Sequence, residues 1–162
     1  MATSNELIAF LLKASQKRFH SYVDDLKPEE FEKQPYPGVN SIAWMLGHLA
    51  LTDRRISAML GAEVPPLPEG FESKFQATRQ AAGQQSDLGD PKELIALFDQ
   101  YRNLLVETVT KASAADLDEP MPNPHPLFGT VGEAAAFMSV HAGLHGGQIT
   151  LLRRAFGYPV IS

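Results

Sequence analysis

The sequence predicts an all-α protein, a four-helix bundle in which a long crossover joins the second and third helices. Three observations lead to this prediction. Four segments repeat apolar residues with helical periodicity, each segment has its own start and stop signals, and no alternating strand pattern competes with them. With 162 residues, 44% of them hydrophobic, the chain is long enough for one domain with a sizeable core. We therefore expect a single helical domain over residues 1–162.

The first helix begins with a capping box and ends before a proline. Thr3 and Glu6 have the spacing at which each side chain caps the backbone N–H of the other residue. Pro28 marks the end of the segment because proline cannot continue a helix. The residues expected to share its apolar face are Ile8, Leu11, Leu12, Phe19, Tyr22, Val23 and Leu26.

The second helix is predicted from Ser41, as N-cap, to Leu60, with Gly61 as the stop. Residues 61–89 then form a crossover, rich in proline at one end and in Gln, Ala and Ser at the other, with one short helix expected inside it. A connection this long inside a compact domain is often functional. The signals of the last two helices are caps and stops at Asp90, Pro91, Glu93, Thr130, Glu133, Gly157 and Pro159.

Composition narrows the classes of partner and site. The net charge is −5 and the basic residues are scattered, so we expect no nucleic-acid partner. The chain has no cysteine, so a metal would need histidine or carboxylate ligands. The N-terminus has no basic leader, which favours a cytoplasmic protein. Residues 134–152 contain no Asp, Glu, Lys or Arg, but their polar residues favour a buried helix of a soluble protein over a membrane span.

Two histidines lie in the stretch "VHAGLHGGQITLLRR" of the last predicted helix. His141 and His145 differ by about 40° around the helix axis, so both side chains leave one face, in the centre of its apolar stripe. An isolated pair at this spacing more often hydrogen-bonds to core neighbours than binds a metal. Burying two neutral imidazoles is nevertheless costly without partners, and a divalent cation would supply one for each ring. His48 is the candidate third ligand, whereas His20 and His125 are expected to face solvent.

The motifs "WMLGHLALTDRR" and "HAGLHGGQITLLRR", about ninety residues apart, resemble those of the DinB/YfiT-like family of four-helix-bundle metalloenzymes. The resemblance covers essentially the whole chain. It implies that His48, His141 and His145 are three metal ligands, that the long crossover joins helices two and three, and that the protein forms homodimers. Some members have an acidic residue at the position of His141, so the ligand set here would be neutral. The family includes thiol-dependent S-transferases, isomerases and hydrolases.

Three neutral imidazoles around a divalent ion leave at least one coordination position open, which is typical of catalytic rather than structural zinc. Bound water or a small thiol would then ionise more readily and become the reactive group, and no independent general base is evident. Zinc is the first expectation, with nickel and iron as alternatives because three-nitrogen sites accept all of them.

Four other residues near the triad are candidates for holding a ligand or substrate. Gln148 could orient a histidine, although a core amide bonded to backbone fits the sequence equally well. Arg55 could receive a substrate carboxylate, against the commoner role of a surface ion pair. Thr52 and Trp44 flank His48, and Trp44 is expected in the core or lining a pocket. Asp53 projects onto the apolar stripe and needs a partner such as an arginine from another helix.

Three glycines of the last helix are predicted to form a close-packing surface. Gly143, Gly146 and Gly147 lie with Ser139 and Thr150 on the side away from the histidines. Each glycine costs up to about 1 kcal/mol relative to alanine in a helix interior, so an advantage must offset it. A surface of small residues permits the close approach of another helix, from the same bundle or from a second chain.

Two functions are compatible with these patterns. The first is a metal-dependent enzyme that acts on a small molecule by hydrolysis or by thiol-dependent transfer or isomerisation, with a low-molecular-weight thiol as cosubstrate. The second is a non-catalytic interaction or sensor module in which the metal site is structural or vestigial. The second predicts that metal raises thermal stability but that the site admits no small molecule.

Overall fold

A computed structural model describes residues 2–76, 85–123 and 125–161, and this part of the chain is all-α. The predicted fold class is confirmed. The expected start signals match the beginnings of the four long helices, whereas the first of them ends at Val23, five residues before Pro28, so that Leu26 lies beyond the helix. The long helices are α1 (Ser4–Val23), α2 (Ile42–Met59), α4 (Pro91–Lys111) and α6 (Val131–Ala155), and the short elements are a 3₁₀ turn (Pro28–Glu30), α3 (Phe71–Phe75) and α5 (Ala114–Asp118).

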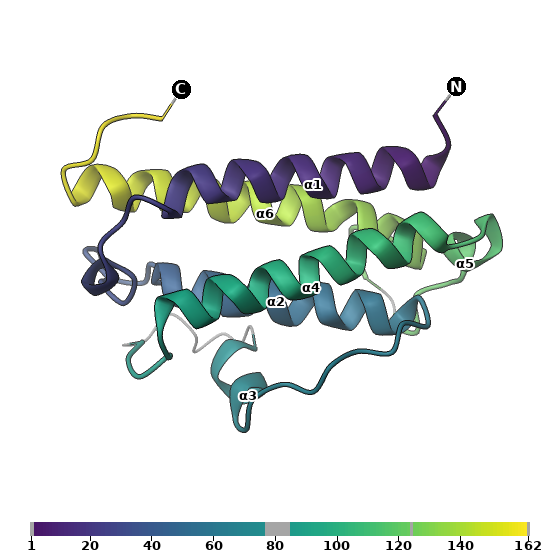
Figure 1. The fold of residues 1–162 in the computed structure, drawn as a ribbon, viewed down its shortest axis with the longest axis horizontal. Coiled ribbons are helices and arrows are strands. Elements are labelled where there is room, and N and C mark those ends of the chain that lie inside the picture. Colours follow the sequence, from purple (N-terminus) through teal and green to yellow (C-terminus); the bar gives the residue numbers. More distant parts are fainter. Residues whose placement is uncertain (1, 77–84, 124, 162) are drawn as a thin grey trace.

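The four long helices form two parallel pairs. α1 packs against α6, and α2 packs against α4. The colours of Figure 1 show α1 and α6 running in one direction and α2 and α4 running in the opposite direction. Because α2 and α4 are parallel, the chain must return along the bundle between them, which explains the long crossover. α3 lies on this crossover and packs against α2. Residues 77–84 of the predicted crossover lie outside the described residues.

The four expected N-caps are present, although Glu93 does not complete a capping box with Asp90. Thr3 and Thr130 are the N-caps of capping boxes, the Ser41 hydroxyl accepts from the backbone N–H of Trp44, and the Asp90 carboxylate caps α4. One expectation for the first helix is wrong: Leu11 is exposed, because the buried face of α1 is narrower than the sequence pattern indicates. α5 and the 3₁₀ turn were not predicted, since helices this short bury too few residues to produce a periodic pattern.

The hydrophobic core has two clusters, one toward each end of the bundle. Between them lies a buried ion pair, in which Arg102 of α4 donates from Nε and Nη2 to the Asp53 carboxylate at 2.7 and 3.1 Å. Both side chains are fully buried. Burial raises the pKa of Asp53 to about 6 and Arg102 opposes the rise, so the carboxylate is ionised at pH 7. The expected arginine partner from another helix is thus confirmed.

Two glycines admit aromatic rings into the bundle. A Cβ on Gly47 would lie 2.3 Å from the ring of Phe75, and a Cβ on Gly146 would lie 2.7 Å from the ring of Tyr22. Gly146 therefore permits close approach of α1 within the same chain. Gly143 and Gly147 have open space at the same position, so no described residue uses the clearance they provide.

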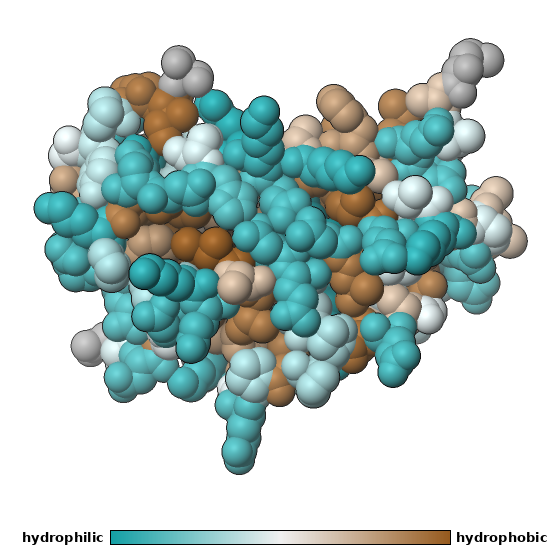
Figure 2. Space-filling view, in the orientation of Figure 1, coloured by the Kyte–Doolittle hydropathy of each residue, from teal (hydrophilic) through white to brown (hydrophobic). Residues whose placement is uncertain are grey.

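On the face that carries α1 and α4, hydrophilic side chains cover most of the surface, with apolar side chains in the furrows between helices (Figure 2). Among the described residues, no helix has the length and apolar character needed to cross a membrane.

Candidate metal centre

The structure brings the three predicted histidines together in the middle of the bundle. His48 comes from α2, and His141 and His145 come from α6. One ring nitrogen from each lies within 4.8 Å of the other two. His48 and His145 are 8% and 9% exposed, whereas His141 is partly exposed. The triad is therefore accessible from solvent mainly along the side of His141.

His48 is oriented by the crossover. Its Nδ1 donates to the backbone carbonyl of Phe75 at 3.0 Å, which leaves Nε2 with a free lone pair. Trp44 stacks on the His48 ring with centroids 4.7 Å apart and 9° between the planes. The Trp44 indole in turn donates to the carbonyl of Lys74 at 3.2 Å. The α3 segment thus fixes both the tautomer and the plane of this imidazole.

His145 is oriented within its own helix. Its Nδ1 donates to the side-chain oxygen of Gln148 at 2.8 Å, and its Nε2 lies 3.1 Å from Nε2 of His141. This gives Gln148 the role of orienting a candidate ligand, one of the two alternatives the sequence left open. Because His145 carries its proton on Nδ1, its Nε2 accepts, and His141 donates to it from Nε2. The other ring nitrogen of His141, Nδ1, is buried and has no hydrogen-bond partner among the described residues.

All three imidazoles are neutral at pH 7. Burial lowers the pKa of His141 to about 3, with further lowering by the two neighbouring histidines. Burial likewise lowers the pKa of His145 to about 4, against the opposing hydrogen bond to Gln148. The pKa of His48 is also lowered, chiefly by burial, and the positive charge of Arg55 adds to the effect. Neutral imidazole is the form that binds metals.

A divalent ion fits this donor set. The hydrogen bonds at Nδ1 of His48 and His145 leave Nε2 unprotonated on both rings, as in metal sites whose histidines are held by an outer acceptor. Ligand nitrogens around tetrahedral zinc are about 3.4 Å apart, so the three nitrogens, which lie within 4.8 Å of one another, would move closer together around an ion. An ion would also replace the single hydrogen bond that joins His141 to His145. The three histidines could therefore hold a metal.

Arg55 and Thr52, the other predicted neighbours of the site, have partners elsewhere. The Arg55 guanidinium pairs with the carboxylate of Glu72 on α3, so it is the surface ion pair that the sequence allowed as the commoner role. The Thr52 hydroxyl donates to carbonyls of its own helix, those of His48 and Leu49. Neither side chain makes a hydrogen bond to an imidazole of the triad.

The two remaining histidines lie outside the triad. His125 is exposed, as expected. The expectation that His20 faces solvent is wrong: it lies half-buried between α1 and α4, with Nδ1 2.8 Å from Asp24 and Nε2 2.8 Å from Asp99. Helical projection placed it correctly opposite the main apolar face but could not show that α4 covers that side.

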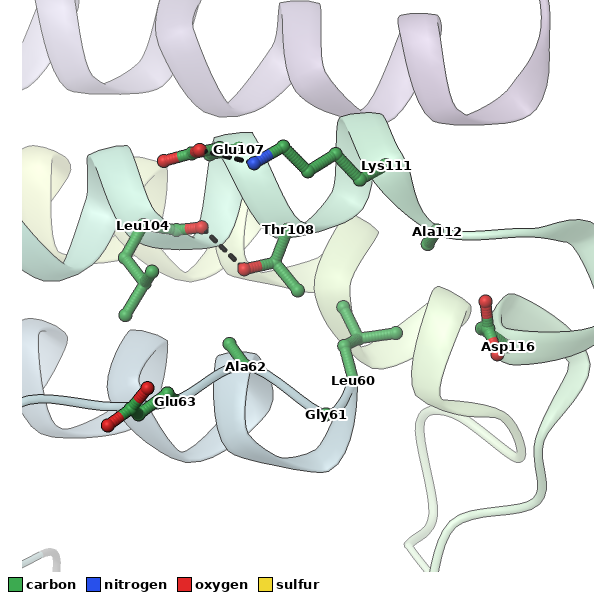
Figure 3. Close-up of a pocket in the computed structure, with 10 residues that line it drawn as sticks. All are labelled: Leu60, Gly61, Ala62, Glu63, Leu104, Glu107, Thr108, Lys111, Ala112 and Asp116. Carbon is green, nitrogen blue, oxygen red and sulfur yellow. Dashed lines mark hydrogen bonds and ion pairs between the residues drawn. The ribbon is translucent and has the colours of Figure 1, made fainter.

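A separate hollow of about 340 Å³ lies between the end of α2, the second half of α4 and the start of α5 (Figure 3). Its lining mixes acidic, basic and apolar side chains and includes none of the three histidines. Figure 3 shows Lys111 turned back along α4 to Glu107, away from the opposite wall.

The family model of the DinB superfamily matches residues 11–149, which include all three histidines and the residues that orient them. The chain belongs to the DinB superfamily. The fold agrees with a crystal structure of a conserved protein from Enterococcus faecalis, at a TM-score of 0.71 and 16% sequence identity over 95% of this chain and 97% of that one. No curated protein matches the chain.

In this DinB-superfamily protein, one part of the site was not predicted from the sequence: the backbone carbonyl that accepts from His48. Phe75 contributes through its backbone carbonyl, and a carbonyl is carried by every residue. The nearest signal in the sequence was Gly47, which stands directly before His48 and makes room for the Phe75 ring.

Proposed function

We propose that this DinB-superfamily protein is a metal-dependent enzyme that acts on a small molecule, by hydrolysis or by thiol-dependent transfer or isomerisation. The observation that carries the proposal is the convergence of three neutral imidazoles, two held at Nδ1 by acceptors and the third partly exposed. A closed structural site would need a fourth protein ligand. Among the described residues, no cysteine or carboxylate completes the triad.

The chemistry supplied by a bound divalent ion would be Lewis acidity at an open position, which lowers the pKa of water or of a thiol there. Zinc is the first choice for a neutral three-nitrogen set, with nickel and iron as alternatives. The chain itself supplies no cysteine, so a thiol nucleophile would come from a low-molecular-weight cosubstrate.

The protein residues have distinct roles in this proposal. The Phe75 carbonyl and Gln148 hold two rings at Nδ1, which leaves Nε2 of each as the atom that would bind the ion. Trp44 forms an aromatic wall against His48. The partly exposed edge of His141 is the side from which a small molecule reaches the triad.

The experiment is elemental analysis of untagged protein purified without metal columns or chelators. Alanine variants of His48, His141 and His145 are compared with His125→Ala, whose exposed ring serves as control. We expect about one divalent metal per chain in the native protein and in the control, and loss of metal in the three triad variants. Native protein that stays metal-free after supplementation with zinc, nickel and iron would overturn the metal centre.

Turnover is tested next, on panels of thiol-transfer and hydrolysis substrates with metal-loaded protein. Activity that disappears in His141→Ala together with the metal supports the enzyme. The alternative is the non-catalytic module, which predicts metal-dependent thermal stability without binding of small thiols at the ion. The absorption spectrum of a cobalt-loaded sample distinguishes the two, because a thiol entering the coordination sphere adds an intense charge-transfer band.

We further propose a homodimer whose contact is centred on Val140 and Leu144, on the outer face of α6 and before the C-terminal end of the helix. Val140 and Leu144 are 52% and 61% exposed on this face, and Gly143 and Gly147 leave open space beside them. No charged residue interrupts residues 134–152. An exposed apolar face of this kind is typical of protein–protein contacts. Sedimentation equilibrium tests the proposal: Leu144→Asp should yield monomers, and an unchanged monomeric mass in both proteins would contradict it.

A further inference from the structure

An apolar cavity lies on the outer side of the C-terminal half of α6, next to Gln148. The cavity, of about 340 Å³, is lined by Tyr36 and Val39 from the segment before α2 and by Gln148, Leu151, Leu152 and Arg154 from α6. This volume is near the lower end of the range of small-molecule pockets, about 300–1,000 Å³. Tyr36 and Leu151 are 53% and 57% exposed, so two large apolar side chains are left open to solvent at its rim.

The polar groups of this cavity are hydrogen-bond donors. The side-chain oxygen of Gln148 accepts from His145, so the group that Gln148 has left to offer is its amide NH₂. The side chain of Arg154 is exposed and makes no hydrogen bond or ion pair with another residue in the described part of the chain, although five N–H groups and a full charge are available to it. Three aliphatic side chains and the phenol ring of Tyr36 therefore adjoin these two donors, one of them cationic.

We propose that this cavity binds a small monocarboxylate with an apolar body, such as a fatty or aryl carboxylic acid. The carboxylate would accept from Arg154 and from the Gln148 amide, and the apolar body would pack on Tyr36, Val39 and Leu151. An arginine matches a carboxylate in geometry as well as charge, and the apolar walls favour a ligand that buries hydrocarbon.

A second copy of the chain fits the cavity less well. A two-fold contact would place α6 against α6, and residues 134–152 contain no aspartate or glutamate. Such a contact would bring apolar side chains to the rim but no carboxylate from this segment to Arg154. A carboxylate ligand satisfies both the apolar walls and the donors.

The site is distinct from the metal centre. His145 turns Nδ1 toward Gln148 and Nε2 toward His141, so its ring separates the cavity from the side on which the three histidines converge. The ligand would therefore bind behind a candidate metal ligand without reaching the ion through its carboxylate. Binding does not depend on the metal and goes beyond the proposed enzyme activity.

The test is isothermal titration of metal-free wild-type protein with octanoate and with 1-octanol, the matched neutral probe. We expect saturable binding of octanoate and weaker binding of octanol. Arg154→Gln should weaken octanoate about tenfold and leave octanol unchanged, since only the charge-assisted contact is removed. Lys13→Gln, which removes an exposed positive charge from α1, is the charge control and should leave both affinities unchanged.

A leucine of α1 provides the matched apolar control. Leu151 lines the cavity and Leu7 does not, yet they are exposed to a similar extent, 57% and 53%. Leu151→Asn should weaken both probes at least about threefold, and Leu7→Asn should weaken neither. Equal effects of the two substitutions, or equal binding of octanoate and octanol, would overturn the proposal in favour of non-specific adsorption. Absence of octanoate binding, with self-association that Leu151→Asn abolishes, would overturn it in favour of a second copy.

Discussion

The Nδ1 atom of His48 donates to the backbone carbonyl of Phe75, 3.0 Å away, and this bond ties α2 to the crossover. The Phe75 ring lies against Gly47, the residue directly before His48. The crossover is therefore part of the candidate metal centre as well as a connection between helices. Any change that displaces Phe75 should alter the orientation of the His48 imidazole.

Gly47→Ala should weaken metal binding through this contact. The new Cβ would lie 2.3 Å from the fully buried Phe75 ring, which must move. We expect overpacking to cost about 1–3 kcal/mol of unfolding free energy, and metal affinity to fall tenfold or more as the acceptor at Nδ1 is displaced. Urea unfolding of metal-free protein and competition with a chromogenic chelator measure the two effects.

Gly143→Ala is the matched control, since nothing lies within 4 Å of its Cβ position. It should leave metal affinity unchanged and add up to about 1 kcal/mol of stability, the helix-propensity difference between the two residues. Equal metal affinity in Gly47→Ala and Gly143→Ala would show that the Phe75 carbonyl does not position His48.

Gln148 should matter through the acceptor it presents to His145. Gln148→Ala removes the oxygen 2.8 Å from Nδ1, and we expect metal affinity to fall about 10–100-fold. Gln148→Glu restores an acceptor of the same length and should retain or improve affinity. Chelator competition on the three proteins checks this, and an affinity of the alanine variant that equals the wild-type value would contradict it.

Periodicity and caps predicted the four long helices and the inward direction of the triad, because both depend on neighbours within one helix. Thr3, Ser41, Asp90 and Thr130 cap as expected. Contacts between elements distant in sequence were harder to predict from the sequence. A partner for Asp53 could be predicted, since a buried carboxylate requires one, but nothing in the sequence singled out Arg102 among the arginines.

His20 is a second case in which a contact between distant elements was not predicted. Its position opposite the apolar face of α1 indicated solvent, but α4 brings Asp99 to that face. The Phe75 carbonyl could not be found at all, because backbone groups leave no trace in residue identity. Side-chain chemistry is thus predictable within an element, whereas the second partner of each polar group depends on tertiary packing.

Removing one partner of the buried Asp53–Arg102 pair should lower the unfolding free energy strongly, whereas replacing both partners by apolar residues should lower it little. Asp53→Asn leaves the fully buried Arg102 charge without its ionised partner, and we expect a loss of about 3–5 kcal/mol of unfolding free energy. Replacing both residues by leucine should recover most of that loss because no charge is then buried. Urea unfolding measures each variant, and Arg55→Gln, which removes an exposed ion pair, should cost less than about 1 kcal/mol.

His20 should make stability depend on pH near neutrality. A carboxylate at each ring nitrogen, from Asp24 and Asp99, requires the doubly protonated ring. Burial opposes this form, but the hydrogen bonds to Asp99 and Asp24 outweigh it, so the pKa of His20 is raised above 6.5. The folded chain then holds the proton more tightly than the unfolded chain, and the stabilisation is complete below pH 6.5 and lost as pH rises through the raised pKa.

We therefore expect the difference in unfolding free energy between wild type and His20→Gln to be largest at pH 6 and to decline as the pH rises through the raised pKa of His20, by about 1 kcal/mol or less because the pair is partly solvated. Urea unfolding at intervals of half a pH unit above pH 6 resolves the trend. His125→Gln is the control, because this ring is exposed and has no carboxylate hydrogen-bonded to it in the described structure. A difference for His20→Gln that stays constant over this range would mean that His20 is neutral and that one of the two carboxylates carries the shared proton.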